Sequence, residues 1–162
     1  MNNPSLFSLS QYQFSLNLFD EFHTNHYAND LWPIVYILSS GGNIQDKVAY
    51  VGETADAYSR MKTHLKNSQK NQLTSVHIIT SEKFNKSATL DIESNLIKYI
   101  SGDGKYKLLN GNLGLANHNY FQKHEIYWDI FISIWNALRA EGVTEHSLGH
   151  IDNSDLFKYL IF

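Results

Sequence analysis

Residues 33–54 read PIVYILSSGGNIQDKVAYVGET and hold two apolar runs on either side of a polar, glycine-containing loop. The runs, at 34–38 and 48–52, are rich in β-branched and aromatic residues, which favour strands. Gly41 and Gly42 interrupt the pattern between them. The segment is therefore predicted to form an antiparallel hairpin.

Helix-like and strand-like segments alternate after the hairpin. We expect a helix with Thr54 or Asp56 as its cap, then a third strand, and then a second helix closed by Gly102. The predicted ranges are a helix to about residue 66, a strand at 75–80, a helix at 87–100 and a turn at 110–112. This order predicts an α+β fold with a small three-stranded antiparallel sheet flanked by helices.

The two ends of the chain are predicted to add helices to this core. Residues 1–12 look poorly ordered, and the predicted N-terminal elements are a short strand at 14–16 and a helix at 20–27. A long helix is expected over 120–140, ended by Gly142, with one apolar stripe at Ile126, Ile130, Ile134 and Leu138. The predicted division is an extension at 1–32, a core at 33–112 and a helical extension at 113–162.

The last residues, 155–162, are apolar and carry no closing signal. This ending indicates either a neighbouring domain downstream or a tail packed on the body of the protein.

Composition limits the class of protein. The 162 residues fit one domain, and 43% hydrophobic with 18% charged residues is typical of a globular chain. The sequence has no cysteine, which excludes disulfides, cysteine zinc sites and thiol nucleophiles. We find no signal peptide and no apolar run long enough to span a membrane, so a cytoplasmic location without membrane contact is expected.

Charge is unevenly distributed along the chain. The segment from Arg60 to Lys107 holds nine of the 13 Lys and Arg residues and four of the 16 Asp and Glu residues. The rest of the chain holds four Lys and Arg residues and twelve Asp and Glu residues. A basic region on an acidic body suits local contact with phosphates. The simpler explanation, solvated lysines on helix faces, is the one that charge alone favours.

Three patterns carry chemistry. Arg60 and His64 lie four apart on a predicted helix, so a phosphate ligand and a titratable group share one face. Tyr36 and Tyr50 lie on the paired strands, and Gly52 is a point where a ligand or backbone can approach closely. Taken singly, each has an ordinary explanation: two exposed side chains on one helix face for the first, and β-sheet packing for the tyrosines.

The third pattern is Glu93, which falls within an apolar helical stripe of Leu90, Ile97 and Ile100. A buried carboxylate needs a partner, which a divalent cation or Arg60 would supply. The alternative is a glutamate at the edge of the stripe that reaches water.

Together these residues resemble the motif of the GIY-YIG nuclease superfamily. Val35-Tyr36-Ile37 and Tyr50-Val51-Gly52 resemble the paired GIY and YIG elements, with Val35 in place of the family's leading glycine. Arg60, His64, Glu93 and Asn110 then follow in the order of the family motif. The resemblance extends from residue 33 to residue 112, about half of the chain.

The resemblance implies a metal-dependent endonuclease that hydrolyses DNA phosphodiester bonds. Glu93 would hold Mg²⁺ (or Mn²⁺), Tyr36 would act as or relay to the general base with help from Arg60 and His64, and Arg60 would stabilise the transition state. Tyr50 would orient water or phosphate by a hydrogen bond, and Asn110 would either position the substrate or support the site by hydrogen bonding. The expected DNA contacts are Gly52, Thr54, Lys62, Lys66 and Lys70.

The chain is also similar in arrangement to the nuclease module found ahead of helicase-type ATPases in some bacterial proteins, which implies a downstream ATPase or a separate partner. Two alternatives remain open at this stage. One is a catalytically weak module of the same fold that binds DNA or acts as a scaffold. The other is a structural domain in which the tyrosines, arginine and glutamate only pack and pair.

Overall fold

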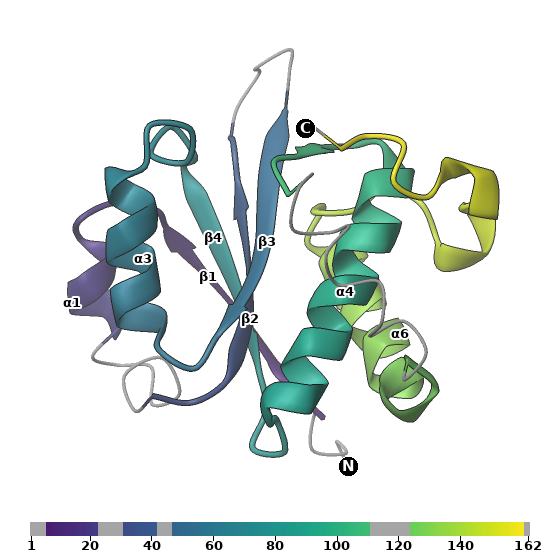
Figure 1. The fold of residues 1–162 in the computed structure, drawn as a ribbon, viewed down its shortest axis with the longest axis horizontal. Coiled ribbons are helices and arrows are strands. Elements are labelled where there is room, and N and C mark those ends of the chain that lie inside the picture. Colours follow the sequence, from purple (N-terminus) through teal and green to yellow (C-terminus); the bar gives the residue numbers. More distant parts are fainter. Residues whose placement is uncertain (1–5, 23–30, 42–46, 111–123, 161–162) are drawn as a thin grey trace.

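The computed structural model describes residues 6–22, 31–41, 47–110 and 124–160, and its centre is a sheet with helices on both faces (Figure 1). The sheet has five strands in the order β1-β4-β2-β3-β5. Their bounds are β1 Ser8–Gln13, β2 Ile34–Ser39, β3 Val48–Thr54, β4 Ser75–Thr80 and β5 Lys107–Leu108. The α+β class is as predicted, but the predicted number of three strands is wrong.

The predicted hairpin and third strand form the middle of this sheet. β2 pairs antiparallel with β3 and with β4, which places Tyr36 opposite Gly52 on one side and Ile78 on the other. β3 pairs with β5 in parallel only at Val48 and Ala49. On the edge of β3 that faces away from β2, the residues from Tyr50 to Thr54 therefore have no strand beside them within the described part of the chain.

The two unpredicted strands lie at the margins of the sheet. β1 pairs antiparallel with β4 along its whole length, in a segment that was predicted to be poorly ordered. The residues of β1 are mostly polar and do not alternate regularly with apolar ones, so their sequence carries no strand signal. The predicted strand at 14–16 is wrong, since β1 ends at Gln13.

Four helices flank the sheet in the described residues. They are α1 Leu18–Phe22, α3 Ala57–Lys66, α4 Lys86–Asp103 and α6 His124–Ala140, followed by short 3-10 turns at Leu148–His150 and Asn153–Asp155. Of the predicted helix at 20–27, residues 23–27 lie outside the described residues, as do 111–112 of the predicted turn and 120–123 of the long helix.

Capping residues determine where the helices begin and end. The Asp56 side chain accepts a hydrogen bond from the Ser59 amide and so begins α3, which confirms one of the two predicted caps. α4 ends at Gly104, whose φ of 84° is easy for glycine. The predicted stop at Gly102 is wrong, because Gly102 lies inside α4. Gly102 instead allows close packing of the helix, since a Cβ there would stand 2.9 Å from Ile151.

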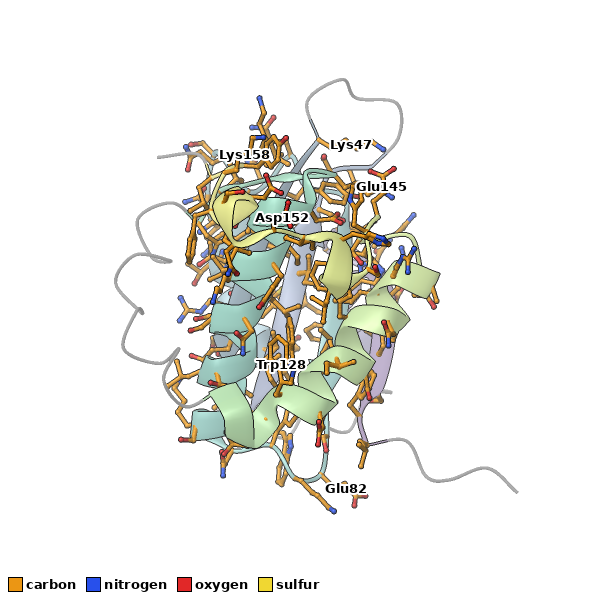
Figure 2. All side chains as sticks on the ribbon, turned by 90° about the vertical axis from the view of Figure 1, so that its right-hand side faces the viewer. Lys47, Glu82, Trp128, Glu145, Asp152 and Lys158 are labelled. Carbon is orange, nitrogen blue, oxygen red and sulfur yellow. The ribbon has the colours of Figure 1, made fainter. Side chains whose placement is uncertain are left out.

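The sheet separates two apolar cores. α1 and α3 cover one face, where Ile34, Tyr36 and Leu38 of β2 point (Figure 1). α4 and α6 cover the other face, against Val35 and Ile37. Trp128 lies on the outer side between α4 and α6 (Figure 2), with its ring centroid 5.8 Å from that of Tyr99. None of the helices in the described part of the chain is long and apolar enough to cross a bilayer.

The apolar tail packs on the body of the protein, which was one of its two predicted explanations. Leu156, Phe157 and Leu160 pack against the core on the α4 side of the sheet. The Phe157 amide donates to the Ser101 hydroxyl, and the Leu108 amide donates to the Tyr159 carbonyl. The division into parts at residues 32 and 112 stays a prediction.

Candidate active site

A buried pair of side chains from β2 and α3 lies at the centre of the candidate site. The Tyr36 hydroxyl and His64 Nε2 are 2.7 Å apart, with exposed fractions of 1% and 2%. Tyr50 completes a ring cluster, since its centroid lies 5.1 Å from that of His64 and 6.3 Å from that of Tyr36. The predicted pairing of two strand tyrosines with a helix histidine is thus present in the fold.

The surroundings fix the protonation of this pair. Burial, and then the neighbouring Tyr50, raise the pKa of the Tyr36 phenol well above its ordinary value, and the Arg60 charge that lowers it is a weaker influence. Burial, Lys70 and Arg60 lower the pKa of His64 to about 4. At neutral pH Tyr36 is therefore a phenol and His64 a neutral imidazole. In the tautomer of His64 that carries its proton on Nδ1, the hydroxyl donates the hydrogen bond to Nε2. The Arg60 charge does favour the phenolate, as expected, but burial of Tyr36 outweighs it.

Gly52 makes room for the Tyr36 ring. A Cβ at this position would stand 2.3 Å from both the Cζ and the hydroxyl oxygen of Tyr36, far inside any real contact. The two residues face each other across β2 and β3. The glycine of the second motif is thus required by the placement of the tyrosine of the first.

Gly52→Ala is expected to lower the free energy of unfolding by about 1–3 kcal/mol, because the buried ring must shift to relieve the overlap. Chemical denaturation of the variant measures this. Gly149→Ala is the matched control, since a Cβ there meets no described atom within 4 Å. Equal stability of the two variants would contradict the close packing of Tyr36 on Gly52.

Glu93 reaches the same site from α4. Only 9% of it is exposed, and its charge raises the pKa of both Tyr36 and Tyr50. Burial, followed by the charge of Glu53, raises the pKa of Glu93 to about 7. The charge of Lys86, a hydrogen bond with the Glu53 backbone and the charge of Arg60 act in the opposite direction. The carboxylate is thus buried, as the helical stripe predicted, and burial together with Glu53 outweighs the positive charges that favour its ionised form.

Arg60 completes the cluster from the solvent side. It is an exposed residue of α3, one helical turn before His64. Its charge acts on Tyr36, Tyr50, His64 and Glu93. A guanidinium in this place can meet a phosphate that approaches the buried tyrosines and the carboxylate.

Residues 33–106 match the family model of the GIY-YIG catalytic domain. They form a GIY-YIG domain. The match begins one residue before β2 and ends one residue before β5, so it contains Tyr36, Tyr50, Arg60, His64 and Glu93. No curated protein and no solved structure matches the chain.

Asn110 lies just beyond the matched region and holds the open edge of the GIY-YIG domain's sheet. The Val51 amide donates to its Oδ1 at 2.9 Å, and its Nδ2 donates to the Val51 carbonyl at 2.6 Å. The side chain is buried and so pairs with β3 in the manner of a neighbouring strand. Its two hydrogen bonds to the backbone of β3 fit support of the site, one of the two roles that the family resemblance implied.

The residues expected to contact DNA do not lie together. Lys70 belongs to the site, with Nζ 4.0 Å from the Tyr50 ring centroid. Lys62 lies toward α1, over the rings of Phe19 and Tyr58. Thr54 is buried, and its hydroxyl accepts a hydrogen bond from the Asp56 amide. Lys66 is an exposed residue at the end of α3.

The sequence analysis missed a polar network beside Glu93. The Glu53 carboxylate accepts hydrogen bonds from Lys86 Nζ at 2.5 Å and from the Thr89 hydroxyl at 3.0 Å. Glu53 alternates with Gly52 along β3, so it projects toward α4 rather than toward the tyrosines. A carboxylate at a strand position that faces a helix is a signal that could have revealed it.

The donor set fits a hard divalent cation at an open site. No group of three or more His, Asp or Glu is arranged to hold a metal within the described residues. Glu93 offers carboxylate oxygens, and a divalent cation beside it would favour its ionised form. Mg²⁺ suits such a site, since it commonly takes one or two carboxylates and keeps several waters.

Proposed function

We propose that the GIY-YIG domain is a metal-dependent endonuclease that hydrolyses DNA phosphodiester bonds. The observation that carries the proposal is the hydrogen bond of the buried Tyr36 hydroxyl to His64, beside Glu93 and Arg60. The family of this domain consists generally of endonucleases. In this proposal His64 would be the proton acceptor, Arg60 the cation for phosphate and Glu93 the carboxylate for a metal ion.

Tyr36 works as a proton relay in this proposal. The attacking water gives a proton to the Tyr36 hydroxyl oxygen while the phenol gives its own proton to His64 Nε2. A free phenolate is not needed, which matters because burial makes one costly. His64 is neutral over the physiological range and can accept the proton. After attack, the bond from phosphorus to the leaving 3′ oxygen breaks, and that oxygen takes a proton from solvent.

Two groups would stabilise the negative charge that builds up around phosphorus in the transition state. Arg60 offers its guanidinium to the phosphate oxygens as negative charge builds up on them. A divalent cation held by Glu93 would neutralise the phosphate and the leaving oxygen. Asn110 keeps β3, and with it Tyr50 and Gly52, in place through its two hydrogen bonds to Val51.

Among the lysines, we propose that Lys70 contacts the DNA backbone and that Lys62 does not. Lys70→Gln is expected to reduce the magnitude of the slope of log K against log salt by about 0.7–0.9, the contribution of one phosphate contact. Lys62→Gln should leave the slope unchanged, because its ammonium lies over Phe19 and Tyr58. Fluorescence anisotropy with a labelled duplex, at several salt concentrations, measures both. Equal slopes for the two variants would contradict this assignment.

The activity itself is tested by incubating the protein with supercoiled plasmid, branched DNA and RNA, with Mg²⁺ or Mn²⁺ and with a chelator. Cutting that depends on the metal supports the proposal. DNA binding without cutting would favour the weak module of the same fold, and the absence of both would favour a purely structural domain. A helicase-type ATPase partner stays a proposal that this assay leaves aside.

A further inference from the structure

Glu53 has no role in the mechanism above, although it lies next to Glu93. Its side chain is only 9% exposed, and each of its oxygens accepts one hydrogen bond from the first turn of α4. The donors are Lys86 Nζ and the Thr89 hydroxyl. A carboxylate that is so little exposed and held by two hydrogen bonds keeps one fixed position, as a residue that supports a binding site must.

Glu93 is linked to Glu53 through the backbone of β3. The Glu53 backbone hydrogen-bonds to the Glu93 side chain, and Glu53 is the charge that acts most strongly on Glu93. Two negative charges in a desolvated place repel each other unless a cation lies between or beside them. Lys86 is the stronger of the two cations acting on Glu93, ahead of Arg60.

Lys86 is well placed to leave when a stronger cation arrives. Its side chain is 61% exposed, so the ammonium can return to water at little cost. One ammonium also neutralises only one of the two carboxylates. A divalent cation would neutralise both, and the waters that Mg²⁺ keeps would need acceptors such as Glu53.

We propose that Glu53 is a second carboxylate of the divalent-cation site and that Lys86 is the resident cation which the metal displaces. The inference rests on the proposed function, since it takes Glu93 as the metal ligand. Glu53 is a positioning residue: it supplies negative charge and a fixed acceptor. Lys86 competes with the metal for that charge and so sets the affinity of the site.

The test measures Mn²⁺ binding to the whole chain by isothermal titration calorimetry, without nucleic acid. Lys86→Met is expected to tighten binding by about 2- to 5-fold, since a competing charge of ordinary ion-pair strength is removed. Glu53→Gln should weaken binding by about 10- to 100-fold, as for other residues that support a metal from the second layer. The deciding variant carries both changes, because Lys86→Met should tighten binding clearly less once Glu53 is neutral and no longer holds the ammonium beside the site.

Lys83→Met is the matched control, since it removes the same charge from an exposed position in the turn before α4. It should bind Mn²⁺ like the unchanged protein. Thermal unfolding without metal checks that every variant is folded. If Lys86→Met binds no more tightly than Lys83→Met, or tightens binding equally without Glu53, the inference fails while the nuclease proposal stands. If the unchanged protein binds no Mn²⁺, both fail.

Discussion

Tyr36→Phe is expected to lower the cutting rate by about 10²- to 10⁴-fold, the usual contribution of a positioned acid–base group. The variant keeps the ring that packs on Gly52 and loses only the hydroxyl that donates to His64. Stability should fall by only about 1 kcal/mol, because one buried hydrogen bond is lost. A single-turnover assay with Mg²⁺ measures the rate, and chemical denaturation measures the stability.

The relay also predicts how the effects of substitutions at Tyr36 and His64 combine. If the proton passes through Tyr36 to His64, then Tyr36→Phe, His64→Gln and the double variant should be about equally slow, since residues that act as a unit are not additive. Tyr58→Phe is the matched control, because it removes a hydroxyl on the part of α3 that faces Phe19. Full activity of Tyr36→Phe, or strictly multiplicative losses in the double variant, would contradict the relay.

The sequence predicts the middle of the fold well because each element there carries its own local signal. The hairpin of β2 and β3 has β-branched runs around a glycine-containing break, and β4 has the same run without glycine. β1 and β5 have no such signal and exist through pairing with strands that are far away in the sequence. The end of α4 shows a related limit, since only the backbone conformation distinguishes Gly104 from Gly102.

The site is predictable in its residue types but not in its charges. The spacing of Arg60 and His64 and the inward position of Glu93 follow from helical periodicity alone. The pKa of Tyr36 depends on how deeply its phenol is buried, and the periodicity of the sequence carries no information on that depth. Glu53 and Lys86 come together from β3 and α4 across 33 positions of sequence, so their pairing follows only from the packing of the helix on the sheet.

Glu93→Gln is expected to abolish metal-dependent cutting, because the amide keeps the size of the side chain but loses the charge that holds a cation. A loss of at least about 10³-fold is expected for a metal site with a single direct carboxylate ligand. The same single-turnover assay measures the loss, over a range of Mn²⁺ concentrations. Recovery of the full rate at high Mn²⁺ would show that Glu93 tunes affinity and does not hold the metal.

The same substitution should make the metal-free protein more stable at high pH. The pKa of Glu93 is raised from about 4.5 to about 7, so the folded state holds a proton that the unfolded state has lost between these values. The unfolding free energy of the unchanged protein therefore falls through this window relative to that of Glu93→Gln. The difference should grow from near zero at pH 4.5 to about 3 kcal/mol at pH 8.

Groups other than Glu93 titrate in both proteins and largely cancel in the comparison. His64 is the main one, since its pKa of about 4 makes each protein lose stability as the pH falls below its ordinary value of 6.5. Denaturant unfolding in chelator at pH 5, 6, 7 and 8 gives the difference directly. We expect Glu93→Gln to lose cutting and to be more stable than the unchanged protein at pH 8. This result would show that the charge of Glu93 destabilises the fold but is needed for activity, as expected of a metal ligand. If the variant is less stable than the unchanged protein at pH 8, the buried carboxylate already has its counter-charge within the chain, and the reason for assigning a metal to it disappears.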